Sequence, residues 1–221
     1  VDAKARLGAE DRITVLLDAQ PDGDRFELEG DYRAPAGGVL AGLSGFESGY
    51  AGRIVGDGTW ARWRGAMVAR TTADPSGSQS PPVAAFQISN DAGKYGVIGQ
   101  LRPGLAANTL IARALGETLS LAASFTLENS VVEGRAAAVS SALDARAGGV
   151  VDLADNVVDG ARVRLTLRDP DLFGESLRLE GGKLAANLNG AFDDLTIKHE
   201  LGVARLVAPG ITATGLTQEG S

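Results

Sequence analysis

The chain has 221 residues, a formal net charge of −7 at pH 7 and no cysteine. The missing cysteine excludes disulfides, thiol catalysis and cysteine-ligated metal sites. The 21 basic residues are scattered and mostly alternate with apolar ones, so we expect no basic stripe for nucleic acid or for a membrane surface. Glycine is abundant, with 30 residues, while aromatic residues make up 5%. This composition is typical of many short strands joined by frequent turns.

The chain begins with Val1, and no charged and then apolar leader follows it. No stretch approaches the roughly 18 apolar residues that a membrane-spanning helix needs. We therefore expect a single β-rich segment, residues 1–221, of a longer protein, with any membrane anchor outside it.

Apolar residues recur at every second position along most of the chain, which predicts strands with one apolar and one water-facing side. In chain order the alternating stretches are residues 13–17, 25–33, 118–128, 162–168, 177–179, 183–189 and 195–197. The apolar positions that we expect to line one continuous face are Phe26, Leu28, Leu119, Leu121, Phe125, Leu127, Val163, Leu165, Leu167, Leu184 and Leu188.

Turn signals separate these stretches at intervals of about ten residues, the spacing of a sandwich, a barrel or an elongated antiparallel sheet. They are hairpin dipeptides and one tripeptide whose residues tolerate positive φ: Asp22-Gly23, Asp57-Gly58, Asp91-Ala92-Gly93, Asp159-Gly160, Gly181-Gly182 and Asn189-Gly190.

Three segments depart from this pattern of alternating stretches and turns. Residues 35–43 and 103–115 are rich in Ala and Leu, and the second predicts one or two helical turns with Asn108 as a candidate N-cap. Residues 73–82 are polar and carry three prolines, which predicts a long surface loop. We therefore expect an all-β fold with at most one or two short helices.

Two short motifs occur twice. Residues 130–134 (SVVEG) resemble residues 156–160 (NVVDG), and residues 58–63 share with 190–195 the form Gly-x-aromatic-x-x-apolar. Together they indicate a quasi-repetitive sheet that adds strands, and not a closed unit with one centre.

No catalytic, metal-binding or cofactor-binding constellation stands out. The one histidine, His199, has no neighbouring nucleophile and is best explained as a surface or strand-end residue. Asp152, Asp155 and Asp159 lack the order of a calcium loop, and Asp193-Asp194 is best explained as a turn. The pair Trp60 and Trp63 could form a sugar or cation platform, although packing is the commoner role. We therefore expect no enzyme, no metal and no cofactor.

The apolar face itself is the remaining candidate site. A sheet with one charged face in contact with water has to bury its other, apolar face against something. Because the inward residues are mainly Leu, Val and Ala, they would suit the aliphatic tails of a lipid.

Three stretches resemble the TamB family, the inner-membrane component of the translocation and assembly module, and its AsmA-like relatives. They are residues 11–28, residues 56–65 with their tryptophan pair, and residues 188–197 with the form Gly-x-Phe-x-x-Leu. The resemblance covers most of the chain except residues 74–82, and its motifs are turn and strand patterns.

The resemblance implies a curled antiparallel sheet, a β-taco-like trough with an apolar interior. It implies a periplasmic segment of an inner-membrane-anchored Gram-negative envelope protein, and a role in phospholipid transport to the outer membrane or in outer-membrane protein assembly. The implied partners are phospholipid acyl chains and, through parts of the protein outside this segment, a barrel of the TamA or BamA type.

Two alternatives stay open. The sheet edge could accept a strand of an unfolded outer-membrane protein by β-augmentation. The segment could also be a structural β-solenoid or adhesin-like piece with no ligand, although hairpin dipeptides favour antiparallel neighbours. A β-helical polysaccharide enzyme is a more distant alternative, because no acid–base pair supports it.

Overall fold

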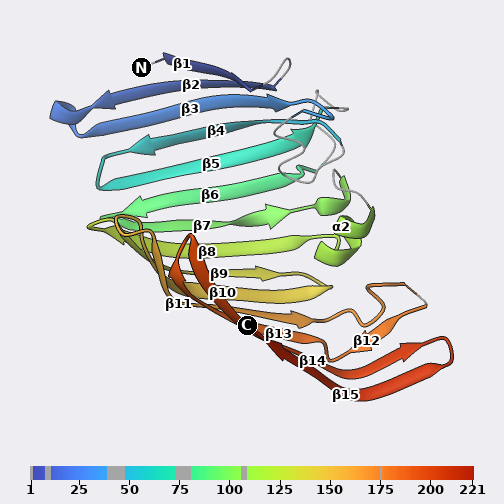
Figure 1. Ribbon diagram of the computed structural model, residues 1–221. Helices are drawn as coiled ribbons and strands as arrows, with labels where there is room; N and C mark the ends of the chain where they lie inside the picture. Colours follow the sequence, from blue (N-terminus) through green and yellow to red (C-terminus); the bar gives the residue numbers. More distant parts are fainter. Residues whose placement is uncertain (1, 8–10, 39–47, 73–80, 106–108, 175) are drawn as a thin grey trace.

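The computed structural model shows one antiparallel sheet of fifteen strands, and Figure 1 shows that most of them lie side by side in chain order. It describes residues 2–7, 11–38, 48–72, 81–105, 109–174 and 176–221. The strands are β1 (Asp2–Leu7), β2 (Asp11–Gln20), β3 (Arg25–Ala34), β4 (Tyr50–Gly58), β5 (Arg62–Thr71), β6 (Ala84–Asp91), β7 (Lys94–Leu101), β8 (Leu119–Glu128), β9 (Val131–Val139), β10 (Leu143–Asp152), β11 (Val157–Leu167), β12 (Arg178–Glu180), β13 (Lys183–Ala191), β14 (Asp194–Ala208) and β15 (Ile211–Gly220). The helices are the 3-10 turns η1 (Pro21–Gly23) and η2 (Pro103–Leu105) and the α-helix α2 (Thr109–Leu115).

Nearly every strand pairs with the next one along the chain, so the sheet is a meander. The exception is at the C-terminal end, where β12 and β13 lie one after the other along the same side of β14, and β15 pairs with the other side. Gly181 and Gly182 interrupt what would otherwise be one long strand. Within the described residues β1 pairs only with β2 and β15 only with β14, so the sheet is open and does not curl into a closed trough.

The molecule is one layer thick over most of its area. In the described part of the chain, the substantial contacts between elements are those between hydrogen-bonded neighbours and those of α2 with η2. The accessible surface is 13676 Å², whereas a compact protein of 22.6 kDa exposes about 9,500 Å². A second layer that would cover the apolar face is therefore missing from the described residues.

The two ends of the strands differ. Tight hairpins join most strand pairs at one end, while the longer connections, η2 and α2 lie at the other, together with the short turns between β9 and β10 and between β14 and β15 (Figure 1). The buried strand residues Ala34, Ala69, Ala84 and Leu119 all lie at this second end. The small apolar core thus sits beside the long connections and leaves the middle of the sheet half-buried.

A β-bulge in β11 keeps the two faces of the sheet consistent. Val158 and Ala161 are three residues apart on β11, whereas the β13 residues that pair with them are two residues apart. Strand β11 therefore carries one extra residue between these two pairs. The extra residue is taken up at Gly160, which has a φ of 59° and donates its N–H to Oδ1 of Asn189 at 2.6 Å. Without this bulge, one half of β11 would present its apolar residues to the wrong side.

The structure confirms the prediction of an elongated, all-β antiparallel sheet with short helices. The helical turn predicted within residues 103–115 is α2 together with η2, while its candidate cap Asn108 lies outside the described residues. Most of the loop predicted at 73–82 and most of residues 35–43 also lie outside them. Two predicted hairpin turns were wrong: Asp159-Gly160 forms the bulge within β11, and Gly181-Gly182 separates β12 from β13. Asp57-Gly58 and Asn189-Gly190 lie in the paired ends of β4 and β13, and the hairpin turns follow at 59–61 and 192–193.

The bulge gives a test of the register. Replacing Gly160 by Ala should lower the free energy of unfolding by about 1–2 kcal/mol, because a side chain disfavours positive φ. Gly202→Ala is the matched control, since a Cβ atom at either glycine would meet open space and Gly202 has no positive φ. Urea unfolding monitored by circular dichroism measures both, and equal effects of the two substitutions would contradict the assigned bulge.

Candidate functional site

The register of the strands places the predicted apolar residues on one face. Directly paired residues of an antiparallel ladder project to the same side of the sheet. One such row crosses ten strands, from β3 to β13, and contains Leu28, Gly56, Gly65, Ile88, Val97, Ala123, Ala136, Ala147, Val163 and Ala186. We call the side that carries this row the apolar face.

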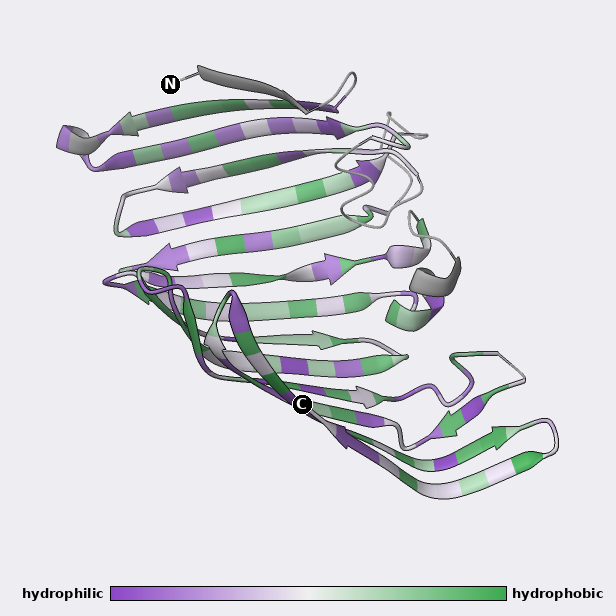
Figure 2. Cartoon of the chain, viewed as in Figure 1, coloured by the Kyte–Doolittle hydropathy of each residue, from purple (hydrophilic) through white to green (hydrophobic). Residues whose placement is uncertain are grey.

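All eleven residues predicted to line a groove lie on this apolar face. They stand in the row itself or two or four residues along the same strand from one of its members. Leu119 is buried, Leu127 is 44% exposed, and the other nine are half-buried. Alternate bands of polar and apolar residues along the strands are visible in Figure 2. The apolar face is therefore continuous, broad and only partly shielded from water.

Glycines on the apolar face lie beneath large side chains of the neighbouring strands. A Cβ atom at Gly56 or at Gly65 would overlap the indole ring of Trp63. In the same way Gly52 lies against Tyr32, and Gly99 lies against Phe86. These aromatic rings occupy the space that a side chain on the opposing residue would need, so they extend the apolar surface over the neighbouring strand.

The two tryptophans pack with Phe26 near the hairpin end of this face. The ring of Phe26 lies 4.9 Å from that of Trp60 and 6.0 Å from that of Trp63. The Trp60 backbone N–H donates to Asp24 at 3.2 Å, and its carbonyl accepts from Asn90 at 3.1 Å. The tryptophan pair thus joins three neighbouring hairpins, which supports the packing role over a ligand platform.

The repeated motifs occupy equivalent places in the fold. Gly58 and Gly190 both have positive φ next to a hairpin turn, and the aromatic residues two positions later, Trp60 and Phe192, are 48% and 51% exposed at the turn. Ser130 and Asn156, which begin the other motif, also share positive φ. The repetition seen in the sequence therefore reflects one hairpin geometry used more than once.

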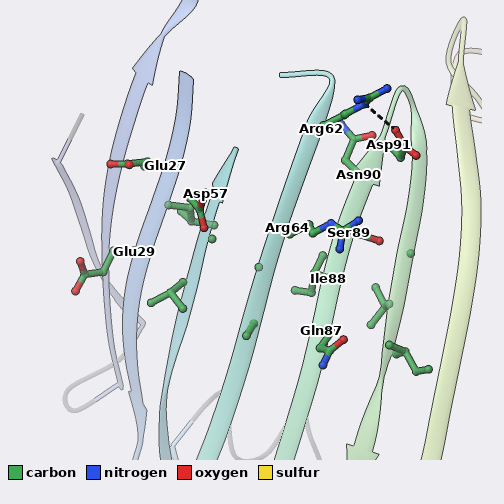
Figure 3. Close-up of a pocket in the computed structure, with 18 of the residues that line it drawn as sticks. Glu27, Glu29, Asp57, Arg62, Arg64, Gln87, Ile88, Ser89, Asn90 and Asp91 are labelled. Atoms are coloured by element: carbon green, nitrogen blue, oxygen red, sulfur yellow. Dashed lines mark ion pairs between the residues drawn. The ribbon is translucent and has the colours of Figure 1, made fainter. Parts of the chain in front are cut away.

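The opposite, charged face carries a hollow of about 1420 Å³ over β2–β8. Figure 3 shows Glu27, Glu29 and Asp57 on one side of it and Arg62 and Arg64 on the other. Arg62 forms an ion pair with Asp91 at 3.4 Å. Of the eleven predicted lining residues only Leu28 borders this hollow. This hollow thus lies on the charged face, and not on the apolar face where a groove was predicted.

The other candidate residues take structural roles. His199 lies on the apolar face opposite Gly220, with Nε2 3.2 Å from Oε1 of Gln218. The Asp152 carboxylate accepts the backbone N–H groups of Ala154 and Asp155 at 2.9 and 3.1 Å, as a turn-forming aspartate does. Within the described ranges no group of three or more His, Cys, Asp or Glu residues could hold a metal ion, and no helix there is long and apolar enough to cross a membrane.

No family model matches the chain, and neither a curated protein nor a solved structure matches it.

The packing of Trp63 over Gly56 can be tested in a Trp60→Phe background, where Trp63 is the remaining tryptophan. Gly56→Ala should displace the indole, change its fluorescence and lower the free energy of unfolding by about 1–3 kcal/mol. The loss should shrink when Trp63 is also replaced by Ala, because the overlap is then gone. An unchanged spectrum, or equal losses with and without Trp63, would contradict this contact. Gly202→Ala again serves as the control.

Burial on the apolar face raises the pKa of Tyr32 from 10.0 to about 12, with a smaller contribution from Tyr50, whose ring lies 5.9 Å away. The folded chain therefore holds the phenol proton more tightly than the unfolded chain does. The resulting stability is complete below pH about 10 and is lost as the pH rises toward 12.

Urea unfolding on both sides of pH 10 checks this expectation. The native chain should lose stability relative to its Tyr32→Phe variant as the pH rises, and ultraviolet titration should show one tyrosine ionising late. A constant difference between the two proteins would contradict the burial of Tyr32.

Proposed function

We propose that the apolar face holds phospholipid acyl chains, and that the chain is a non-enzymatic section of a TamB-like envelope protein in the periplasm. One observation carries the proposal: the predicted residues form a continuous apolar face, and no second layer among the described residues covers it.

Energetics supports a ligand on this face. Apolar surface left in water costs about 25 cal/mol per Å², and a soluble monomer seldom exposes an apolar patch of more than a few hundred Å². The side chains are mostly aliphatic and half-buried, which suits flexible hydrocarbon tails that can adapt to a broad surface. The charged face keeps the same sheet in contact with water.

The apolar face also suits the movement of acyl chains from strand to strand across the sheet. Rows of apolar residues cross from strand to strand without an intervening charged residue, as the row from Leu28 to Ala186 shows. An acyl chain held by such contacts would meet similar apolar side chains at each strand, so no single position would bind it much more tightly than the next. In this proposal a barrel of the TamA or BamA type would be met by other parts of the longer protein.

Site-specific photocrosslinking tests the proposal. A benzophenone amino acid would replace Leu165 in one protein and Thr166 in another. Leu165 projects from the apolar face, and its neighbour Thr166 projects from the charged face. In cells with labelled phosphate, Leu165 should trap phospholipid and Thr166 should not. Lipid adducts at both positions, or at neither, would contradict the proposal.

A second candidate function rests on the strand edge. Within the described residues β15 has one unpaired side, and its ten residues include one charged side chain, Glu219, and no Pro or Lys. Edges that avoid aggregation usually carry Lys or Pro, so this one could accept a strand of an unfolded outer-membrane protein. Lysine at Ala213 and Thr217 should then abolish peptide capture, while Asp at Leu121 and Leu165 should leave it intact.

A further inference from the structure

A second hollow lies on the charged face over β10 and β11, with a volume of about 380 Å³. Its charged lining residues are all arginines, namely Arg146, Arg162 and Arg164. Its remaining lining consists of Ala147 and three glycines, Gly148, Gly149 and Gly160. Small residues on the floor and guanidinium groups around it make this hollow chemically different from the mixed-charge hollow over β2–β8.

The register of three strands gathers the positive charge. Gly148 is paired with Arg135 on one side and with Arg162 on the other. In the next row toward the long connections, Arg146 is paired directly with Arg164. Four arginines thus surround a position that has no side chain, with neighbouring Cβ atoms about 5 Å apart and diagonal ones about 7–8 Å apart.

This arrangement is unfavourable unless something offsets it, because like charges directly opposite each other destabilise a sheet. Within the described residues only Arg146 among the four has a carboxylate partner, Asp144 at 3.2 Å. That carboxylate is shared with Arg168 at 2.8 Å, and the two arginines hold the pKa of Asp144 below its ordinary value despite desolvation. Nε of Arg135 donates to the neutral Oγ of Ser124 at 3.2 Å.

Composition does not dictate this cluster. The chain has 28 acidic and 21 basic residues, and some arginines elsewhere on the charged face have acidic partners, as Arg53 has Glu29 and Arg62 has Asp91. The scattered distribution of basic residues in the sequence did not predict this local cluster. Pairing of β9, β10 and β11 brings together arginines that are 29 residues apart in the sequence from first to last, 135 to 164.

We propose that this hollow binds a phosphoryl group. A guanidinium presents a planar fork of N–H donors that matches two oxygens of a phosphate. Arg162 and Arg164, which line the hollow, and Arg135 beside it have no carboxylate partner among the described residues. Together they favour a multiply charged oxyanion over a single carboxylate. The glycine floor lets the anion approach the sheet closely. The source is a free phosphate or phosphate monoester, or the headgroup of an anionic lipid at a membrane surface.

The inference is independent of the proposed lipid-binding function. The arginines project from the face opposite to the one that would hold acyl chains, so one lipid lying flat on the apolar face does not reach them through the sheet. The two sites can therefore fail separately: loss of the arginines should leave crosslinking at Leu165 unchanged.

Titration calorimetry with inorganic phosphate at low salt measures the binding directly. The native chain should show saturable heat, and Arg162→Gln with Arg164→Gln should weaken binding by about tenfold or more for each guanidinium removed. The matched control is Arg53→Gln with Arg62→Gln, which changes the net charge equally on the same face and should leave binding within about twofold. Arg162→Lys with Arg164→Lys keeps the charge but loses the forks, and should fall between these results.

Sedimentation with phosphatidylcholine vesicles, with and without phosphatidylglycerol, separates the two sources. Binding that needs phosphatidylglycerol and disappears with Arg162→Gln and Arg164→Gln assigns the phosphoryl group to a lipid headgroup. Phosphate binding without vesicle binding assigns it to a free ligand. No binding of either probe, or equal loss in the control variant, overturns the proposal. Circular dichroism of each variant verifies that the exposed substitutions leave the sheet folded.

Discussion

The register between neighbouring strands is the constraint on which the rest of the structure depends. Side chains alternate between the faces with a period of two, so a slip of one residue in any ladder would exchange the apolar and charged faces beyond it. Strand β11 carries one residue more than its partners, and the bulge at Gly160 absorbs it. The alternation of side chains between the two faces is therefore the same on both sides of the bulge. The same pairing that aligns the apolar residues also aligns the arginines around Gly148 on the other side.

A sheet without a second layer needs stabilisation from within its own plane. Here it comes from backbone ladders, from side chains packed across neighbouring strands, and from aromatic rings that lie over glycines such as Gly56 and Gly99. The fully buried residues gather at the end with the long connections, where Leu119 and Ala34 lie. Elsewhere the apolar side chains are shielded mainly by one another. A ligand on this face would therefore add to the burial that the chain achieves alone.

Much of the fold could be predicted from the sequence, because large apolar residues mark alternate positions. Strands β8 and β13 match the alternating stretches 118–128 and 183–189 closely. Strands β9 and β10 gave a weaker signal, since Ala and Gly occupy many of their positions on the apolar face, such as Ala136 and Ala147. Turn chemistry was less decisive: Asp159-Gly160 supplies positive φ equally well to a hairpin or to a bulge, and the hairpin at Asn129-Ser130 has no glycine to mark it. The arginine hollow was beyond sequence reasoning, because each arginine stands between apolar or small residues and their proximity depends on pairing.

The open meander also bears on how such a protein can change in length. Each strand contacts mainly its immediate neighbours, so stability is close to a sum of local terms, as in repeat proteins. Removing or duplicating one hairpin, for instance β8 with β9, restores the direction of the chain and keeps both faces in phase. Evolution could thus adjust the width of the surface in steps of two strands, about 10 Å at a time, without redesigning a common core.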